Sequence, residues 1–180
     1  MEKKFNIISC INLVDAIGKD GDLLYRISSD LKNFKAMTTD NVVIMGKKTF
    51  LSLPNGNPLL DRINVVITTD PHFSVDASFD NVYIVHSIED AVELCETLFQ
   101  NLEWFVIGGQ SIYQQFLARD LIDTMYLTIV NDNTEGDVHF PNVYKDKNKW
   151  KVFYKSYTQR YRPTETTYIF EILKKRYKRE

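Results

Sequence analysis

An acidic side chain, Asp30, stands among apolar residues near the start of a predicted helix. Leu31 follows it directly, and Phe34 comes three residues after Leu31. Leu31 and Phe34 therefore share one helix face, and Asp30 lies close to the edge of that face. A carboxylate in that position costs free energy unless a polar group meets it. The alternative is a helix cap, because Ser28, Ser29 and Asp30 all favour a helix N-terminus. The pattern therefore allows a carboxylate that faces a ligand or one that caps the helix.

A second segment has the residues of an anion site. A predicted buried strand ends at Gly46 and is followed by Lys47, Lys48 and Thr49 at a helix start. A helix N-terminus offers N–H groups and the positive end of its dipole to an anion, and the two lysines add charge. Asn41 stands where a phosphate-binding loop would have its first glycine, so this is not that motif. The lysines alone would equally fit a solvated helix end, but with Asp30 they suggest an enzyme that binds a phosphorylated cofactor.

The composition is that of an ordinary soluble globular protein, with 44% hydrophobic and 26% charged residues among 180. We expect residues 1–180 to form one domain. The net charge of −2 argues against a nucleic-acid partner, and no apolar run approaches the ~20 residues that cross a bilayer. Cys10 and Cys95 lie in apolar patterns, as expected for buried thiols in a reducing cytoplasm. The basic end, Lys174–Arg179, is interpreted as a solvated terminus.

Hydrophobic periodicity predicts strands that alternate with helices over the first two-thirds of the chain. Such alternation implies mostly parallel pairing, with helices on both faces of the sheet. The last two strands alternate apolar and polar residues and are expected to form an antiparallel pair. The predicted strands are Asn6–Val14, Asn41–Met45, Ile63–Thr69, Val82–Val85, Trp104–Ile107, Thr124–Val130, Trp150–Tyr157 and Thr166–Lys174, and the predicted helices are Ser29–Met37, Lys48–Leu53, Ile88–Phe99 and Gln110–Leu117.

Ligands of such sheets bind beyond the carboxyl ends of the strands. Asp30, Gly46, Thr69 and Gly108 all follow predicted strands closely, so they are expected to gather at that edge. The predicted fold class is thus α/β: a single domain with a central, mostly parallel eight-stranded sheet, an antiparallel C-terminal strand and helices on both faces.

Four segments carry a resemblance to a known family. In chain order, Ser29–Lys35, Val43–Phe50, Val106–Tyr113 and Glu135–Pro141 resemble the motifs of the dihydrofolate reductases, and the similarity runs from about Ile7 to about Leu173. The resemblance implies NADPH-dependent reduction of 7,8-dihydrofolate to 5,6,7,8-tetrahydrofolate. It also implies small-molecule ligands and a monomer, with no metal. His72, His86 and His139 accordingly lack ligand spacing.

The resemblance assigns catalytic roles to Asp30, Tyr25 and Thr128. Asp30 becomes the ionisable residue of the pterin pocket, where a carboxylate can accept from a ring nitrogen and an exocyclic amine at once. Burial is expected to raise its pKa, which suits proton supply near neutral pH. Thr128 is expected to hydrogen-bond this acid, although a β-branched strand residue would fit the sequence equally well.

The remaining roles also come from the resemblance. Lys47 is expected on the ribose phosphate of NADPH, with Lys48 and Thr49 toward the pyrophosphate and Thr68 and Thr69 near the ribose phosphate. The other expected cofactor contacts are Cys10, Ile17, Gly18, Gly46, Gly108, Gly109, Gln110, Ser111, Ile112 and Tyr113. In the family, the peptide bond between the two adjacent glycines is cis.

For the substrate, the resemblance predicts an arginine for the glutamate carboxylate and apolar walls around the aminobenzoyl ring. Arg62 takes the first role, which suits the bidentate geometry of arginine. Backbone carbonyls would receive the pterin amine. The expected substrate contacts are Ile8, Leu31, Phe34, Lys35, Leu53, Leu59, Arg62 and Ile107.

The chain departs from the family pattern in a loop that closes over the nicotinamide. Leu24 and Tyr25 stand where the family has Pro-Trp, and Ser28 stands where proline is common. Leu23 takes the apolar lid position. We expect activity to survive with an altered rate or inhibitor response. A further basic position is Ser111 here, which weakens the expected preference for NADPH over NADH.

Two other functions fit parts of the sequence. A related reductase could act on a pyrimidine of flavin synthesis, but Asp30, Phe34 and Arg62 favour a pterin with its glutamate. A non-catalytic folate-binding or structural descendant is supported only by the change at Leu24 and Tyr25.

Overall fold

A computed structural model describes residues 4–177 of the chain, so Lys178 and Arg179 of the basic tail lie outside the described residues. Strands and helices alternate in the first two-thirds, as predicted. The elements are β1 (Phe5–Asn12), β2 (Ala16–Lys19), β3 (Asp22–Leu23), α1 (Ser28–Thr38), β4 (Val42–Gly46), α2 (Lys47–Leu51), η1 (Pro54–Gly56), β5 (Ile63–Ile67), β6 (Val82–Val85), α3 (Ile88–Leu98), β7 (Trp104–Gly108), α4 (Gln110–Ala118), β8 (Ile122–Val130), β9 (Val138–His139), η2 (Asn142–Lys145), β10 (Trp150–Lys155), β11 (Gln159–Tyr161) and β12 (Thr166–Lys175).

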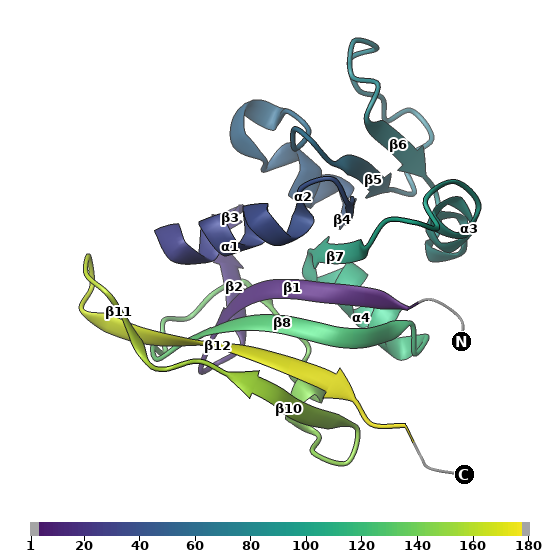
Figure 1. Cartoon of the computed structure of the whole chain (residues 1–180). Helices are drawn as coiled ribbons and strands as arrows, with labels where there is room; N and C mark the ends of the chain where they lie inside the picture. The colour runs from purple at the N-terminus through teal and green to yellow at the C-terminus, as the bar shows by residue number, and fades with distance from the viewer. Residues whose placement is uncertain (1–3, 178–180) are drawn as a thin grey trace.

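The main sheet has the strand order β10-β12-β8-β1-β7-β4-β5-β6, with β11 paired to the start of β12 (Figure 1). Neighbouring strands from β8 to β6 pair in parallel. Only β12 runs against them, pairing antiparallel with both β8 and β10. The predicted mostly parallel sheet with an antiparallel C-terminal strand is therefore confirmed.

Alternate residues of the central strands face opposite sides of the sheet, and helices cover both sides. Val42 and Ile44 belong to a buried cluster that includes residues of α3 and α4. Val43 and Met45 pack instead with Phe50 of α2. This period of two places each side chain in one of two cores.

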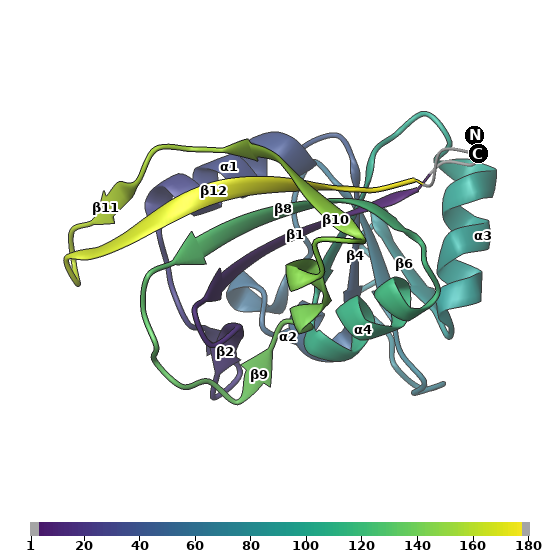
Figure 2. The same cartoon turned by 90° about the horizontal axis from the view of Figure 1, so that it is seen from below.

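A second, small sheet lies beyond the carboxyl end of β1. It has the order β3-β2-β9, and Figure 2 shows β2 beside β9. Residues 18–27, which include Leu23, Leu24 and Tyr25, were predicted to form a loop, and that prediction was incomplete because β2 ends and β3 lies within them. Strands of two to four residues leave too little periodicity to recognise, and β9 pairs with β2 from far along the chain.

The helix starts differ in their caps. Ser87 caps α3 as a helix start should, because its side chain accepts a hydrogen bond of 3.0 Å from the backbone N–H of Asp90. By contrast, the N-cap of α1 is Ile27, with no hydrogen bond from its side chain, and Ser28 lies inside the helix. Asp30 is therefore in the first turn and not at the cap.

Candidate functional site

Asp30, on α1, is hydrogen-bonded to a side chain of the main sheet. The hydroxyl of Thr128, on β8, donates a hydrogen bond of 2.5 Å to Oδ1 of Asp30. Thr128 is buried, and burial raises the pKa of the Asp30 carboxyl, while the Thr128 hydrogen bond acts in the opposite direction. The acid thus has a polar partner, as its position on an apolar helix face requires, and the raised pKa matches the expectation from the sequence.

Residues of strand β1 lie next to Asp30 and Thr128. Cys10 is in register with Thr128, and burial followed by the charge of Asp30 raises the pKa of its thiol. The buried Tyr113 of α4 donates a hydrogen bond of 2.9 Å to the carbonyl of Ile8, and burial raises its pKa. Residues from α1, β1, β8 and α4 therefore converge around Asp30.

Glycines let the ends of β4 and β7 both approach α4. The Gly108–Gly109 peptide is cis, and Gly108 has φ +117°. A Cβ at Gly108 would lie 3.3 Å from the Tyr113 ring, and one at Gly46 would lie 3.2 Å from Cγ1 of Ile112. Any larger residue would push these groups apart.

The starts of α2 and α4 consequently lie side by side. A Cβ at Gly109 would be 3.4 Å from Oγ1 of Thr49. Gln110 accepts a hydrogen bond of 2.9 Å from the backbone of His139, which ties α4 to β9. Ser111 is exposed and accepts from Gln115.

Lys47 has an acidic partner that the sequence analysis missed. Its Nζ lies 2.6 Å from Oδ2 of Asp70 and 5.2 Å from the centre of the Phe73 ring. The Lys47 hydrogen bond lowers the pKa of Asp70, which favours the ionised carboxylate. Thr68 is buried and its hydroxyl accepts from the backbone N–H of Asp70, while Thr69 is exposed. The only hint of this ion pair in the sequence was that Asp70 directly follows Thr68 and Thr69.

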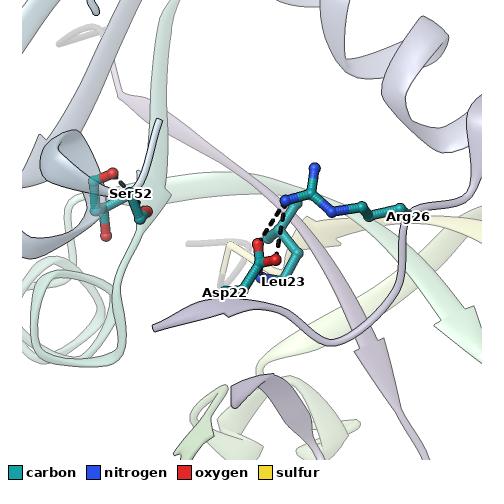
Figure 3. Close-up of polar contacts among 5 residues, drawn as sticks. Asp22, Leu23, Arg26 and Ser52 are labelled. Carbon is teal, nitrogen blue, oxygen red and sulfur yellow. Dashed lines mark hydrogen bonds and ion pairs between the residues drawn. The ribbon is translucent and has the colours of Figure 1, made fainter. Parts of the chain in front are cut away.

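The segment before α1 is held by polar contacts as well. Arg26 donates to both carboxylate oxygens of Asp22, at 2.7 and 2.9 Å (Figure 3). Gly18 lies close to this turn, because a Cβ there would be 2.9 Å from the Asp22 carbonyl oxygen. Leu23, the expected lid residue, is 53% exposed, and Ile17 is half-buried.

Tyr25 is bonded to two side chains that the sequence analysis also missed. Its hydroxyl donates to Asp132 and accepts a hydrogen bond of 3.1 Å from Nδ2 of Asn12. Burial, followed by the bond to Asp132, raises the pKa of Tyr25 to about 12. No motif marked Asn12 or Asp132, since asparagine and aspartate are ordinary residues of strand ends and turns.

Apolar residues of the expected substrate walls are incompletely covered. Leu31 is 39% exposed, and Phe34 is half-buried on the same helix. Leu53, Leu59 and Ile107 pack at the margin of the Val43 and Met45 cluster, which places them together. Lys35 is exposed. Such exposed apolar side chains suit a surface that a ligand covers.

Arg62 is buried and anchored. Its Nε donates a hydrogen bond of 3.2 Å to Thr38, and another nitrogen donates to the Leu60 carbonyl. Burial lowers its pKa, although the group stays charged. An adjoining cavity of about 560 Å³ is lined by Arg62 together with the acids Asp40, Asp61 and Asp80, among others.

Metal-binding clusters and membrane-spanning helices are absent from the described residues. Within residues 4–177, no group of three or more His, Cys, Asp or Glu side chains could hold a metal ion. Nor is any helix of that range long and apolar enough to span a membrane.

The chain is similar to known proteins over most of its length. The sequence model of the family described as "Dihydrofolate reductase" matches residues 4–175. A dihydrofolate reductase of Bacillus subtilis (strain 168) is 38% identical over 149 residues, 81% of each chain. One from Staphylococcus haemolyticus is 38% identical over 148 residues, 82% of this chain and 81% of that protein. The solved structure of a dihydrofolate reductase from Enterococcus faecalis, complexed with NADP(H) and RAB-propyl, has a TM-score of 0.79 over 96% of both chains. At 24% identity it is a likeness of fold.

Proposed function

Because the chain belongs to the dihydrofolate reductase family, we propose that it reduces 7,8-dihydrofolate to 5,6,7,8-tetrahydrofolate and oxidises NADPH to NADP⁺. When bound, NADPH would supply a hydride to a carbon of the pterin imine, and one proton from water would complete the adjacent nitrogen. The hydrogen bond between Thr128 and Asp30 is the observation that supports this proposal most directly. It brings the one acid of the apolar helix face to the edge where parallel strands bind ligands.

Asp30 holds the pterin and supports its protonation. Its carboxylate accepts from a ring nitrogen and the neighbouring exocyclic amine, as charge-assisted pairs do. The raised pKa keeps a proton available closer to neutral pH than an ordinary aspartate would. Thr128 fixes the orientation of the carboxylate, and Oδ2 together with the second lone pair of Oδ1 remains for the ligand. The carbonyls of Ile8 and Ile107 receive the exocyclic amine.

The rest of the substrate lies along α1. Leu31, Phe34, Leu53 and Leu59 contact the aminobenzoyl ring, Lys35 lies at the exposed rim, and the buried Arg62 pairs with the glutamate carboxylate. These apolar contacts and the arginine hold the pterin in position for reaction. Holding a substrate in the reactive geometry makes a large contribution to lowering the reaction barrier.

The cofactor fits the glycine-lined approach between the starts of α2 and α4. Gly46, Gly108 and Gly109 allow backbone contact, and Lys47, Lys48, Thr49, Thr68 and Thr69 supply donors for its phosphates. Since α2 has only five residues, the lysine side chains contribute more positive charge than its dipole. The remaining contacts are Cys10, Ile17, Gly18, Gln110, Ser111, Ile112 and Tyr113. We propose that the protein works as a monomer.

The test follows NADPH absorbance after dihydrofolate is added. Wild type is expected to turn over, and Asp30→Asn is expected to lose at least a hundredfold in rate, the usual scale of proton catalysis (~10²–10⁴). Asp76→Asn is the matched control, because Asp76 is exposed and accepts only a local turn hydrogen bond from Ser78. Turnover in neither Asp30 form would leave a binding or structural role. Equal turnover in both would exclude Asp30 as the residue that supports protonation.

A further inference from the structure

One buried amide, that of Asn12, joins three segments at the end of the sheet. Its Nδ2 donates to the hydroxyl of Tyr25 at 3.1 Å and to the carbonyl of Thr134 at 2.8 Å. Its Oδ1 accepts from the backbone N–H groups of Val14 at 3.2 Å and Ala16 at 2.9 Å. Asn12 has no exposed surface, so its hydrogen-bonding capacity is spent within the protein.

Asp132 completes this junction from the segment after β8. It accepts from the Tyr25 hydroxyl and, at 3.2 Å, from the backbone N–H of Thr134. Hydrogen bonds from Thr134 and then Tyr25 lower the pKa of Asp132, while that of Tyr25 is about 12. Tyr25 therefore remains a donor and Asp132 an ionised acceptor around neutral pH, which favours a charge-assisted bond.

The junction adjoins the Asp30 site along the same two strands. Asn12 is in register with Val130, two residues beyond the pairing of Cys10 with Thr128. The Tyr25 ring and Cys10 both pack against the cluster of Ile27, Val130 and Tyr168. Movement of Tyr25 would thus disturb a cluster that Cys10, the strand neighbour of Thr128, also contacts.

The residue next to Tyr25 is bonded to the strand that the cofactor is expected to touch. This residue, Leu24, donates a backbone hydrogen bond of 3.3 Å to Ile17, and the next residue toward the N-terminus, Ala16, is bonded to Asn12. These bonds hold Ala16 and Ile17 beside Leu24 and Tyr25.

We propose that Asp132 is a positioning residue that acts through Tyr25: with Asn12 it fastens the segment before α1 against the ends of β1 and β8. The bond sets how firmly this segment closes over the bound cofactor. That last step rests on the proposed function, whereas the fastening itself does not.

The first experiment is a double-mutant cycle on NADPH dissociation, followed by protein fluorescence without substrate. Tyr25→Phe and Asp132→Ala are each expected to speed dissociation roughly three- to tenfold, the scale of one hydrogen bond. The double variant should be no faster than the worse single one, because both remove the same bond. Asp132→Asn keeps an acceptor oxygen and should stay within about twofold of wild type.

Tyr177→Phe is the matched control. The Tyr177 hydroxyl donates a hydrogen bond of 2.5 Å to the Asp123 carboxylate, the same type of bond as that between Tyr25 and Asp132. It lies at the opposite end of β8. This variant should leave dissociation unchanged. Additive effects of Tyr25→Phe and Asp132→Ala, or an equal effect of Tyr177→Phe, would overturn the proposal.

A second readout separates this proposal from the function itself. Hydrogen exchange on the protein alone should speed up at the amides of Ala16, Leu24 and Thr134 in Tyr25→Phe and Asp132→Ala. Faster exchange there without dihydrofolate turnover in wild type would support the fastening and reject the function. Unchanged exchange at these amides would reject the fastening even in an active enzyme.

Discussion

Thr128 and Asp30 lie 98 residues apart in the sequence, yet the threonine hydroxyl donates a 2.5 Å hydrogen bond to the carboxylate. Parallel strands make this contact possible. The chain reaches α1 soon after the carboxyl end of β1, and β8 pairs in parallel with β1, so the carboxyl ends of both strands lie at the same edge of the sheet. The bond favours the ionised acid, while burial favours the protonated one. These opposed effects set the pH at which the site gains or loses its proton.

Removal of the Thr128 hydroxyl should therefore move the pH dependence of turnover. Thr128→Val deletes the contact that stabilises the carboxylate, so the pKa of Asp30 rises further. If the protonated acid supports reduction, kcat/KM falls as pH rises through this pKa, and the falling limb moves to higher pH. Thr124→Val on the same strand is the control, since Thr124 bonds Asp123 and not Asp30. A limb that stays in place would show that Thr128 does not tune Asp30.

Asp30 should also cost the protein stability at neutral pH. Its pKa is raised in the folded chain, so the folded state keeps a proton that the unfolded state has released. Stability then decreases as pH rises above the unfolded value of about 4. Asp30→Asn is expected to raise Tm by a few degrees at pH 7, with the gain vanishing near pH 3. Calorimetry at the two pH values tests this, and a gain equal at both would contradict the linkage.

The main elements follow from the sequence because long apolar runs define them. The buried run Val42–Met45 and the apolar stripe of α3 need little tertiary information to recognise. The short strands β2, β3 and β9 could not be predicted in this way, because their pairing arises only once distant segments meet.

Some residues of the site could be predicted from the sequence and others could not, for a similar reason. Asp30 stands out locally, since a charge on an apolar helix face needs a partner. Asp70 and Asp132 do not, because an aspartate in a turn is ordinary until the fold brings Lys47 or Tyr25 beside it. The predicted ligand roles of Asp30, Lys47 and Tyr25 stay predictions, and the acids beside Lys47 and Tyr25 are what the structure adds.

The ion pair between Lys47 and Asp70 should weaken selection for the cofactor's extra phosphate. Asp70 neutralises the lysine and places a negative charge where a phosphate is expected. Asp70→Asn should lower KM for NADPH roughly two- to fivefold, the modest scale of half-exposed charges, with little change for NADH. Asp76→Asn removes an equal charge without a lysine partner and is the control. An unchanged ratio of the two kcat/KM values in Asp70→Asn would show that Lys47 does not contact that phosphate.

Gly108 should tolerate substitution least among the glycines with positive φ. At φ +117° an alanine is strained, and its Cβ would also press on the Tyr113 ring at 3.3 Å. Gly108→Ala is expected to lower the free energy of unfolding by roughly 2–4 kcal/mol, from strain and overpacking together. Gly21→Ala is the matched comparison, because Gly21 has φ +80° with open space around it and should lose only ~1 kcal/mol. Urea denaturation measures both values. Equal losses would mean that backbone strain alone decides the cost and that Tyr113 yields freely, in which case its hydrogen bond to Ile8 would not fix the ring against the site.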